Sequence, residues 1–475
     1  MNREIIGREN ETQILGKLLQ SRRAELLAIY GRRRVGKTYL IKTYYKEHLA
    51  FSCSGQYNGK TREQLINFTE QLNAYFPGQK RMLAAATWQE AFGFLRAGID
   101  SIGHGRKKVI FFDELPWLDS HKSGFVSSFS YFWNAYAEER NDLLFVICGS
   151  AASWIIDKIV NNKGGLHNRI TQRIRLLPFT LLETEQYLAH KNIKLERYQL
   201  LQLYMVMGGV PAYLDAIERG KSAAQNIEKM CFSKDGVLTG EFENLYAALF
   251  NRPEKHIQVI EALAKKNKGL TRAEILKTGK LLTGGGITSV LNELTESGFI
   301  ERLNMFGNVQ KESVYHLTDE YSLFYFKFMQ HQERAQWLLK QTTPSYTSWC
   351  GYAFENISLK HIAQIKRALQ IGAVQTTESS WSLAGNKERD GAQIDLLIDR
   401  ADQTITFCEI KFSTKPFVID KKYAAELRHK VDVFRRQTNT RKALLLTFIT
   451  TYGIAGNEYK EQLADGEITM EALFT

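Results

Sequence analysis

Eight consecutive residues near the start of the chain have the types and the spacing of a phosphate-binding loop. In order, they are Gly31, Arg32, Arg33, Arg34, Val35, Gly36, Lys37 and Thr38. The pattern matches G-x-x-x-x-G-K-[ST] throughout, and its glycines allow successive backbone N–H groups to surround an anion at a helix N-terminus. We expect Lys37 to reach the β- and γ-phosphates of ATP, and the Thr38 hydroxyl to bind Mg²⁺.

The segments on both sides of this loop have the composition that it requires. The apolar run 26–30 is typical of a buried strand, and residues 38–44 are compatible with a helix. A strand, a glycine-rich loop and a helix in this order form the structural context of the motif. A chance glycine-rich turn is the alternative, and the agreement of motif and context argues against it. We assign Tyr39, the next residue, to the same nucleotide site.

Two acidic residues follow another apolar run, 109–112, which is typical of a buried strand. They are Asp113 and Glu114, and in an open parallel sheet they would lie at the carboxyl edge, where ligands bind. Asp113 is placed to bind Mg²⁺ directly or through water, and Glu114 to polarise the attacking water. The alternative, a strand that ends in a solvated turn, is weakened by the phosphate-binding loop upstream.

Three polar residues further along are candidates for contacts with the γ-phosphate. Ser150 ends the apolar run 143–149, and either lies beside Asp113 to contact this phosphate or its water, or caps a helix over 151–160. Arg169 is our first candidate for an arginine finger and Arg173 the second. Surface arginines on an edge strand are an equal alternative for both.

Two weaker signals flank the central motifs. Arg8, in Gly-Arg-Glu just upstream of the first strand, can pack near a bound base or ribose, or belong to an ordinary helix-start turn. Residues 182–230 are typical of helices and predict a small helical lid, broken at residues 208–211. There, Pro211 would bring a helix N-terminus against the nucleotide, or mark a plain helix–helix turn.

Taken together and in this order, the motifs resemble the STAND branch of the AAA+-like P-loop ATPases, in the family often described as archaeal-type ATPases. The resemblance covers residues ~1–330 and extends to the run of three arginines in the loop. It implies an ATP-binding switch with a helical lid and a following winged helix. It also implies that Arg8 lies near the base and that Pro211 belongs to an element that senses the nucleotide.

Composition narrows the class of protein. A chain of 475 residues, 44% hydrophobic and 24% charged, is typical of a soluble globular protein with about three domains. Its net charge of +12 favours a polyanionic partner such as DNA, although a nucleotide site also needs basic residues. The five cysteines form no CxxC pair, which predicts buried thiols in a reducing cytoplasm. We expect no signal peptide, membrane span or membrane partner.

Residues 254–264, 271–277 and 287–294 form three helix patterns, followed by a hairpin-like pair at 298–303 and 313–317. Three helices and a β-wing predict a winged helix, a variant of the helix-turn-helix. The face of the third helix carries no Arg or Lys but instead Thr288, Asn292, Glu293 and Glu296. Because phosphate contacts need basic side chains, a connector or partner-binding module is favoured over DNA reading.

A second set of acidic and basic residues lies near the C-terminal end. Asp395, Glu409 and Lys411 fall in two runs typical of strands. Residues i and i+2 of a strand share a face, so Glu409 and Lys411 should point to one side, beside Asp395 on the neighbouring strand. Two carboxylates and a carbonyl suit Mg²⁺, and Lys411 would orient a water or stabilise a pentavalent phosphate. Glu355, one helix earlier, could complete the metal shell.

The expected elements of this tail follow the order α-β-β-β-α-β. They are a helix over 351–357, strands over 371–375, 393–399 and 404–411, a helix over 419–437 and a strand over 443–448. With Asp395 and Glu409-x-Lys411, this order resembles the PD-(D/E)xK nuclease superfamily over residues ~345–450, with Ile394 in place of Pro. The alternative is an inert nuclease-like fold whose acid–lysine pair is a structural salt bridge.

Basic residues are frequent in the sequence after Asp395, Glu409 and Lys411. They either line a DNA path or solvate a helix face, and they are Lys415, Lys421, Lys422, Arg428, Lys430, Arg435 and Arg436.

We therefore predict an α/β protein with a P-loop ATPase core (1–180), a helical lid (181–250), a winged helix with a linker helix (251–335) and a nuclease-like α/β domain (345–475). The expected function is an ATP-binding and hydrolysing switch, with Mg²⁺, coupled to a metal-dependent effector that acts on DNA. The alternative is an ATP-dependent regulatory or DNA-binding protein whose nuclease-like domain is inactive. A scaffold that assembles as a homo-oligomer when ATP binds is a third interpretation.

Overall fold

The computed structural model describes residues 4–160, 166, 168–250, 252–266, 269–281, 286–307, 313–330, 337–383, 385 and 391–475. The chain divides into two compact units. The first comprises Met1–Pro178, Ala247–Asn251 and Asn292–Gly298, and the second comprises Phe179–Tyr246, Arg252–Leu291 and Phe299–Thr475. The division into four domains stays a prediction.

A five-stranded parallel sheet forms the centre of the first unit. Its strands are β1 (Glu25–Tyr30), β2 (Leu49–Ser54), β3 (Lys108–Asp113), β4 (Leu143–Gly149) and β5 (Gln172–Arg175). In space they follow the order β2-β3-β4-β1-β5, so that β4 separates β1 from β3. The carboxyl ends of these three central strands therefore meet at one edge, which carries the loop 31–38, Asp113 and Ser150.

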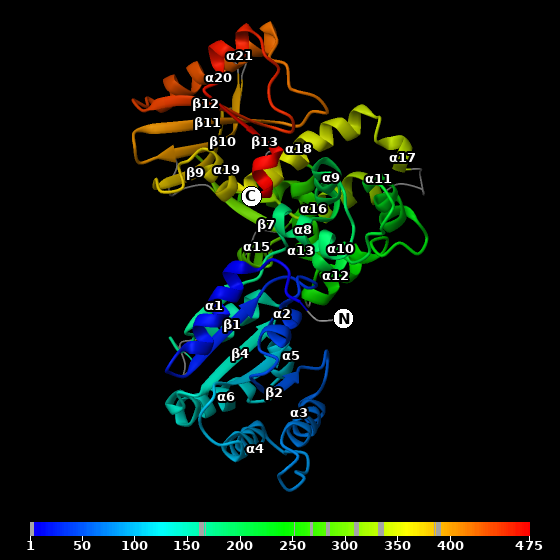
Figure 1. Ribbon diagram of the computed structural model, residues 1–475, viewed down its shortest axis with the longest axis vertical. Coiled ribbons are helices and arrows are strands. Elements are labelled where there is room, and N and C mark those ends of the chain that lie inside the picture. Colours follow the sequence, from blue (N-terminus) through cyan, green and yellow to red (C-terminus); the bar gives the residue numbers. More distant parts are fainter. Residues whose placement is uncertain are drawn as a thin grey trace. The chain divides into compact units, whose positions relative to one another are not determined.

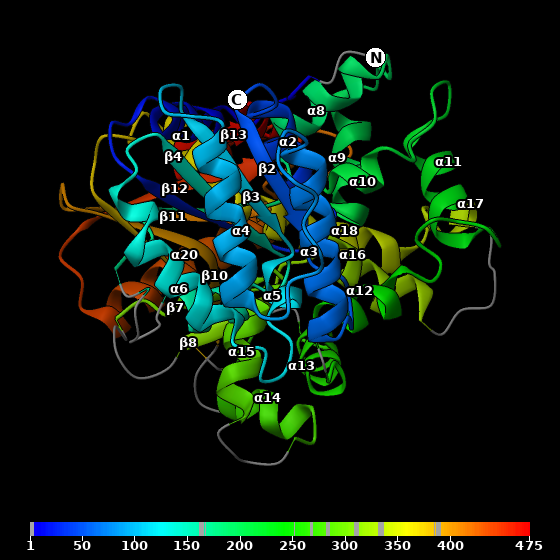
Figure 2. The same ribbon diagram turned by 90° about the horizontal axis from the view of Figure 1, so that it is seen from below.

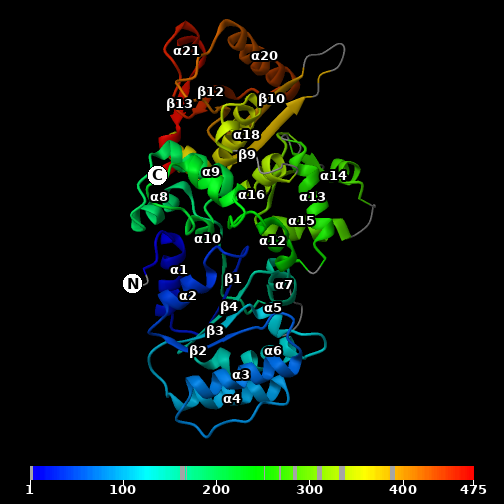
Figure 3. The same cartoon turned by 90° about the vertical axis from the view of Figure 1, so that its right-hand side faces the viewer.

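Helices cover both faces of this sheet (Figures 1 and 3). The helices α1 (Glu9–Gln20) and α2 (Lys37–Tyr44) cover one face. The other face, toward the viewer in Figure 2, is covered by α3 (Thr61–Tyr75), α4 (Trp88–Ser101) and α6 (Phe125–Ala135). Shorter elements are α5 (Leu115–Leu118), η1 (Ala137–Glu139), α7 (Ala152–Ile155) and the π-helical η2 (Ile156–Val160). The helix expected over 151–160 thus changes from α to π geometry at Ile156.

Strand β1 illustrates why this sheet is apolar on both faces. Leu26 and Ala28 pack in the core under α3, α4 and α6, whereas Leu27 and Ile29 pack in the core under α1 and α2. Because successive side chains of a strand point to opposite faces, a strand between two helical layers must be apolar throughout. This burial confirms the α/β class that the apolar runs predict.

The aromatic stripe of α6 belongs mainly to the core. Its buried members are Phe125, Phe129, Phe132 and Trp133, whereas Tyr131 is 66% exposed. All five cysteines are free and buried, as expected. Among the residues that the structure describes, no helix has both the length and the apolar character needed to cross a membrane.

The second unit contains a group of helices, most of which come early in the unit and some of which lie from residue 320 onward. They are α8 (Leu181–His190), α9 (Arg197–Met207), α10 (Pro211–Leu214), α11 (Ala223–Ile227), η3 (Glu228–Phe232), α12 (Glu241–Leu249), α16 (Glu320–Phe324), the π-helical η4 (Tyr325–Met329) and α17 (Trp337–Lys340). The last three residues of α12 belong to the first unit. The expected break between α9 and α10 is present. There, the Gly209 carbonyl accepts a hydrogen bond from the Phe179 N–H at 2.7 Å, and a Cβ on Gly209 would lie 1.9 Å from the Phe179 oxygen. This close approach requires glycine.

Three helices and a small antiparallel sheet occupy the segment predicted as a winged helix. They are α13 (Glu254–Ala264), α14 (Arg272–Thr278), α15 (Gly286–Glu296), β6 (Leu270–Thr271), β7 (Ile300–Asn304) and β8 (Ser313–Leu317), with the strand order β6-β8-β7. A capping box starts α14, in which the Thr271 hydroxyl accepts from the Glu274 N–H at 3.3 Å and the Glu274 carboxylate accepts from the Thr271 N–H at 2.8 Å. The winged-helix interpretation itself stays a prediction.

A mixed five-stranded sheet forms the C-terminal part of the second unit. Its strands are β9 (Thr376–Leu383), β10 (Ala392–Arg400), β11 (Thr404–Lys411), β12 (Ala443–Thr450) and β13 (Gly466–Thr469), in the order β13-β12-β11-β10-β9. The pairs β9–β10 and β10–β11 are antiparallel, and β11–β12 and β12–β13 are parallel. Two helices, α18 (Pro344–Lys360) and α19 (Ile362–Ala368), lie on one side, and α20 (Lys421–Thr438) and α21 (Glu458–Leu463) on the other (Figures 1 and 3). The short η5 (Met470–Phe474) follows β13.

The strand expected over 371–375 is wrong, because this segment is a turn and the first strand, β9, starts at Thr376. Helix α19 ends in a Schellman motif: Gln370 has a left-handed φ of 57°, and the Ile371 N–H donates to the Lys366 carbonyl at 2.9 Å. The buried Ile371 side chain therefore anchors the end of a helix. An apolar residue in that role is easily mistaken for the start of a strand.

His361 connects the start of α8 to the end of α18. Its Nε2 accepts a hydrogen bond from the Leu181 N–H at 3.1 Å, so its Nδ1–H donates to the Ile357 carbonyl at 2.8 Å. Burial lowers the pKa of this imidazole to about 4. Only the neutral ring can make both bonds, since a protonated Nε2 cannot accept.

We expect acid to destabilise the second unit through His361. A histidine whose folded pKa of about 4 lies below its unfolded value of about 6.5 favours unfolding as the pH falls through this interval. This pKa difference lowers the free energy of unfolding by about 3 kcal/mol in total as the pH falls from ~6.5 to ~4. His361→Gln should remove this part of the pH dependence, measured by denaturant unfolding between pH ~7 and ~4. The control is His121→Gln, at an exposed histidine; parallel pH profiles for wild type and His361→Gln would contradict the prediction.

Candidate functional site

The backbone of residues 31–38 follows the path that a phosphate-binding loop needs. Gly31 has a φ of 145°, and a Cβ on it would lie 2.2 Å from the Leu176 carbonyl oxygen. Arg34 and Gly36 also have positive φ values, of 68° and 90°, and Gly36 is the N-cap of α2. These left-handed residues curl the loop so that α2 begins with Lys37.

Lys37 is buried inside this loop. Its Nζ donates to the carbonyls of Gly31, at 2.7 Å, and Arg32, at 2.8 Å. Burial lowers the pKa of the ammonium, and its neighbours Cys148, Glu114 and Asp113 act in the opposite direction. The charge that would meet the phosphates is therefore held at the centre of the loop by two of the loop's own carbonyls.

The two side chains predicted to bind Mg²⁺ in the first unit are in direct contact. The Thr38 Oγ1 donates to Asp113 Oδ2 at 2.8 Å, and Asp113 Oδ1 accepts from the Glu114 N–H at 3.1 Å. A hydroxyl and a carboxylate oxygen are ligands that suit Mg²⁺, so the donors fit this ion. The contact joins the helix after the loop to the end of β3.

Glu114 contacts Ser150, a partnership that neither interpretation of the serine named, and the place of Ser150 at the γ-phosphate stays a prediction. The Glu114 Oε2 accepts from the Ser150 N–H at 3.1 Å and from the Ser150 hydroxyl at 2.9 Å. The hydroxyl is thus directed at Glu114, whereas the sequence placed it beside Asp113 or at the N-terminus of a helix. Glu114 itself has a left-handed φ of 44°, which turns the chain from β3 into α5. Two donors fix one oxygen of Glu114 in place.

Arg8 and Tyr39 lie close to the loop but have partners of their own. The buried Arg8 donates to the Val35 carbonyl at 3.2 Å and forms an ion pair with Glu11 at 3.5 Å. The Tyr39 hydroxyl donates to the Glu4 carbonyl at 2.9 Å, and the side chain is 46% exposed. Arg8 therefore stabilises the loop through the Val35 carbonyl. A position near a bound base stays a prediction.

The arginines of the loop and of β5 have different surroundings. Arg32 is buried, Arg33 is half-buried and Arg34 is exposed. Arg173 is exposed on β5, and Arg175 donates to the backbone carbonyls of Thr295 and, at 3.1 Å, Glu296.

Arg169 forms an ion pair with Glu138 of η1, a partner for which the sequence gave no signal. Both side chains are partly exposed. A role as an arginine finger would require Arg169 to leave this pair. Pro211 is the first residue of α10 and belongs to the second unit, and its role in sensing the nucleotide stays a prediction.

The tail brings Asp395, Glu409 and Lys411 together. Lys411 Nζ lies 3.3 Å from Glu409 Oε2, and Asp395 Oδ2 accepts from the Ile410 N–H at 3.3 Å. The register of β10 against β9 shifts between Ile394 and Leu397, so Asp395 lies at a bulge. A bulge re-aims a side chain, and it is common next to functional sites.

Helix α20 adds two residues to this cluster. The Lys430 Nζ donates to Glu409 Oε1 at 2.8 Å, and the Tyr423 hydroxyl donates to Glu409 Oε2 at 2.7 Å. Lys430 thus faces the buried carboxylate rather than solvating a helix face, and its place on a DNA path stays a prediction. Tyr423 and Lys430 are seven residues apart, which places them on one helix face. That spacing, after a strand with Glu-x-Lys, was the available signal.

The charges of this cluster are closely coupled. Burial, together with the nearby Glu409, raises the pKa of Asp395 to about 6. Glu409 has no exposed surface and receives three donors. In the described part of the chain no group of three or more His, Cys, Asp and Glu side chains could hold a metal ion, so Glu355 does not form such a group with Asp395 and Glu409.

Comparison with known proteins identifies the first half of the chain. Residues 5–217 match the family model of an ATPase domain found predominantly in Archaea. An archaeal-type ATPase domain therefore occupies this part of the sequence. An uncharacterized protein of Methanocaldococcus jannaschii is 23% identical over 416 residues, which are 86% of this chain and 87% of that protein.

Two solved structures resemble this protein. The Walker-type ATPase PABY2304 of Pyrococcus abyssi is similar over 68% of this chain and 96% of its own, with a TM-score of 0.51 and 17% identity. The ORC2 protein of Aeropyrum pernix, in ADPNP–ADP complexes, is similar over 76% of this chain and 96% of its own, with a TM-score of 0.44 and 14% identity. The Pyrococcus structure supports the fold of the ATPase domain.

The ion pairs of Glu409 can be tested by a double-mutant cycle. Lys430→Met should lower the free energy of unfolding by about 3 kcal/mol, because it removes one partner of a buried charge. When Glu409→Gln is added, the cost should be smaller than the sum of the two single changes, with a coupling of about 1–3 kcal/mol. Denaturant unfolding of the four proteins measures this coupling. Additive costs would mean that Lys430 and Glu409 do not stabilise each other.

Proposed function

We propose that the chain binds and hydrolyses ATP, and that its nucleotide state switches a nuclease-like effector that acts on DNA. The contact between the Thr38 hydroxyl and the Asp113 carboxylate carries the ATP half of the proposal. It joins, at the end of a phosphate-binding loop, the two groups that hold Mg²⁺ in P-loop proteins. The match of residues 5–217 to an ATPase domain supports the same conclusion.

Each side chain of the ATPase domain has a separate task in this proposal. The N–H groups of residues 31–38 surround the phosphates, and Lys37 exchanges its two carbonyl partners for phosphate oxygens. Thr38 and Asp113 would hold Mg²⁺, which neutralises the charge of the triphosphate when bound. Glu114 orients the attacking water with one carboxylate oxygen, while Ser150 fixes the other.

Further residues complete the nucleotide site. Arg8 would contact the base or ribose, Tyr39 would flank the site, and Pro211 would sense the nucleotide. Arg169 would stabilise the charge on the γ-phosphate after leaving Glu138, either within the chain or from a second copy in an ATP-dependent homo-oligomer. The buried thiols fit a cytoplasmic location.

The cluster in the tail supports a second activity, metal-dependent cleavage of DNA. Asp395 and Glu409 would hold Mg²⁺ or Mn²⁺, which supplies Lewis-acid chemistry when bound. Lys411 lies beside Glu409 and would orient the attacking water or stabilise the charge on the phosphate. Lys430 must then release Glu409 Oε1, so α20 and the metal compete for one carboxylate oxygen.

The same contacts also favour the rival function, a regulatory or DNA-binding protein whose tail does not cut. Two lysines already accompany the carboxylates of Asp395 and Glu409, and both oxygens of Glu409 have donors. A cluster with balanced charge has less need of a metal ion. In that case the acid–lysine pairs stabilise the fold, and the basic face of α20 contacts nucleic acid without cleaving it.

The ATPase half predicts different effects for two substitutions. Lys37→Ala should abolish ATP binding, whereas Glu114→Gln should retain binding and lower turnover by about 10²–10⁴-fold, as for the loss of a general base. Nucleotide titration and phosphate release measure the two quantities. The matched control is Glu139→Gln at an exposed acid of the same unit. Unchanged ATP affinity in Lys37→Ala would refute the assignment of the loop.

The effector half predicts cleavage of DNA that depends on Lys411. Linear, supercoiled and branched DNA would be incubated with Mn²⁺, with and without ATP, and with the wild-type chain or Lys411→Ala. Cleavage by the wild type, reduced at least about 100-fold in the variant, is expected because Lys411 acts on the reacting phosphate. Lys194→Ala, at an exposed lysine outside the cluster and outside the candidate DNA path, is the control. Salt-sensitive DNA binding with intact DNA in every reaction would favour the rival function.

A further inference from the structure

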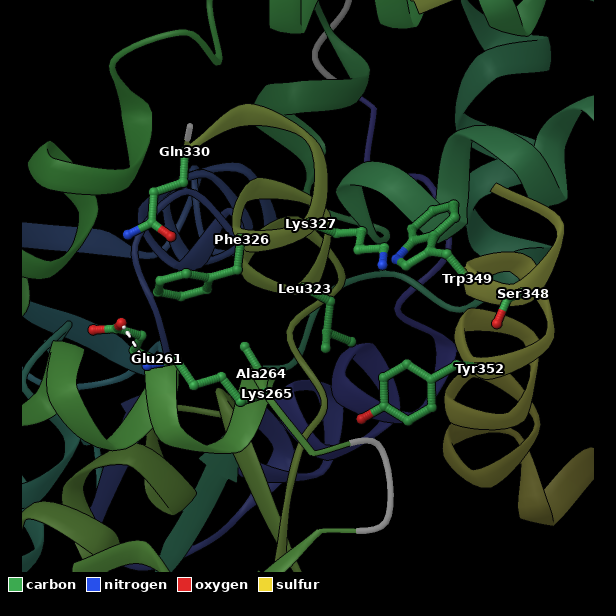
Figure 4. A pocket seen from close by; sticks show the side chains of 10 residues that line it. All are labelled: Glu261, Ala264, Lys265, Leu323, Phe326, Lys327, Gln330, Ser348, Trp349 and Tyr352. Carbon is green, nitrogen blue, oxygen red and sulfur yellow. Dashed lines mark hydrogen bonds and ion pairs between the residues drawn. The ribbon is translucent and has the colours of Figure 1, made fainter. Parts of the chain in front are cut away.

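The pocket in Figure 4 lies between helical segments of the second unit and has a volume of about 360 Å³. Leu323 occupies the space between Phe326 and Tyr352, and the two lysines of its lining, Lys265 and Lys327, are exposed. The charged groups therefore lie at the rim. The described lining thus lacks the convergent polar groups that orient a small ligand.

Two exposed aromatic side chains lie together at the carboxyl edge of the parallel sheet in the first unit. Tyr57 follows β2, and Trp117 belongs to α5, which follows β3. Their ring centroids are 5.4 Å apart, in an edge-to-face arrangement. Tyr57 is 56% exposed and Trp117 is partly exposed. The pair presents apolar ring surface to solvent, and covering such surface is favourable.

The loop that carries Tyr57 is held in one conformation by Gln64 of α3. This glutamine has no exposed surface, and its side-chain oxygen accepts from the Gln56 N–H at 3.0 Å. Its amide nitrogen donates to the carbonyls of Gln56, at 2.7 Å, and Gly59, at 3.4 Å. Three hydrogen bonds from a buried side chain fix the loop before any partner arrives. Little ordering is therefore left to oppose binding at Tyr57.

The loop after β2 and the segment after β3 are packed closely against each other. The Gly55 N–H donates to the Asp113 carbonyl at 2.9 Å, which extends the pairing of the two strands. A Cβ on Gly55 would lie 2.6 Å from the Glu114 carbonyl oxygen. Further along, the hydroxyls of Thr61 and Ser120 are 2.7 Å apart and share a hydrogen bond. The two segments therefore form one continuous surface beside Glu114.

Cations accompany the aromatic pair on both segments. Lys60 and Arg62 lie on the first segment and Lys122 on the second, and all three are exposed. Of the two acids nearby in sequence, Glu63 accepts from the Lys60 N–H at 2.8 Å at the start of α3. Burial raises the pKa of the other, Asp119. Exposed rings with cations on either side suit a polymer of stacking bases joined by phosphates.

We infer that this surface binds single-stranded nucleic acid. A base stacks on Tyr57 beside Trp117, and the neighbouring phosphates contact Lys60, Arg62 and Lys122. A duplex suits the surface less well, because its bases stack on one another and offer no free ring face. The inference goes beyond the proposed function, since it places a strand on the ATPase domain and requires neither ATP hydrolysis nor DNA cleavage.

Fluorescence anisotropy with a labelled oligothymidine of about 16 nucleotides tests the inference. The full chain is used in EDTA without nucleotide, so that neither proposed activity can take place. Tyr57→Ala should weaken binding about 5- to 100-fold, as for the loss of one stacked base, whereas Tyr57→Phe keeps the ring and should bind like the wild type. The matched control is Tyr131→Ala, at a 66% exposed tyrosine of α6 in the same unit, which should change nothing.

The salt dependence tests the phosphate contacts. Lys60→Gln and Lys122→Gln should each reduce the slope of log K against log salt concentration by about 0.7, the value for one phosphate contact on a single strand. Lys46→Gln, at an exposed lysine of the same unit, should leave the slope unchanged.

Photo-cross-linking with 5-iodouracil in the oligonucleotide, followed by mass spectrometry, separates this surface from the tail. We expect cross-links at Tyr57 or Trp117. Cross-links confined to the second unit would leave the proposed function intact and overturn the inference. Equal effects of Tyr57→Ala and Tyr131→Ala would also overturn it. So would an absence of binding, which would leave the aromatic pair to a protein partner.

Discussion

The ATPase domain depends on one close approach of backbone to backbone, where β1 ends. The Leu176 N–H donates to the Tyr30 carbonyl at 2.8 Å, which extends the pairing of β5 with β1 up to the loop. At the next residue, Gly31, any side chain would collide with the Leu176 carbonyl. The chain must therefore turn at this point, and the turn fixes where α2 begins. Thr38 meets Asp113 because the loop starts from this one constrained position.

The central part of the nucleotide site could be predicted because its signals are local. The loop 31–38 is a motif of contiguous residues, and Asp113 and Glu114 directly follow the apolar run 109–112 of β3. Helix and strand bounds in this half were close to the observed ones, since a strand buried on both faces is apolar throughout. Arg8 could be located near the loop, but its partner, the Val35 carbonyl, could not be predicted from Gly-Arg-Glu.

The contacts that escaped prediction join residues that are distant in sequence. Ser150 and Glu114 are 36 residues apart, and Lys430 and Glu409 are 21 apart. Such pairs are set by how strands and helices pack, and only for Lys430 does a spacing in the sequence, seven residues after Tyr423, point to the shared helix face. A local feature was also missed at the end of α19. Gln370 adopts the left-handed conformation that glycine usually supplies at a helix end, so the sequence does not mark the cap, and the buried Ile371 was mistaken for the start of a strand.

The two charged clusters differ in what surrounds their carboxylates. Asp113 accepts hydrogen bonds from a hydroxyl and a backbone N–H, both neutral donors, at the open edge of a sheet. Glu409 lies fully buried under α20, with two ammonium groups as partners. The first arrangement leaves negative charge for a cation to neutralise, whereas the second already contains the neutralising charge. A metal ion is therefore more strongly expected at Asp113 than at Glu409.

The five buried cysteines have a practical consequence. Cys53 and Cys148 lie in the sheet of the ATPase domain, and Cys231, Cys350 and Cys408 are spread over the second unit. Burial raises the pKa of each thiol, so none reacts readily with an alkylating reagent while its surroundings stay folded. The rate of labelling at each position then reports how often that region opens. The wild-type chain thus carries internal probes for separate regions, with no engineered label.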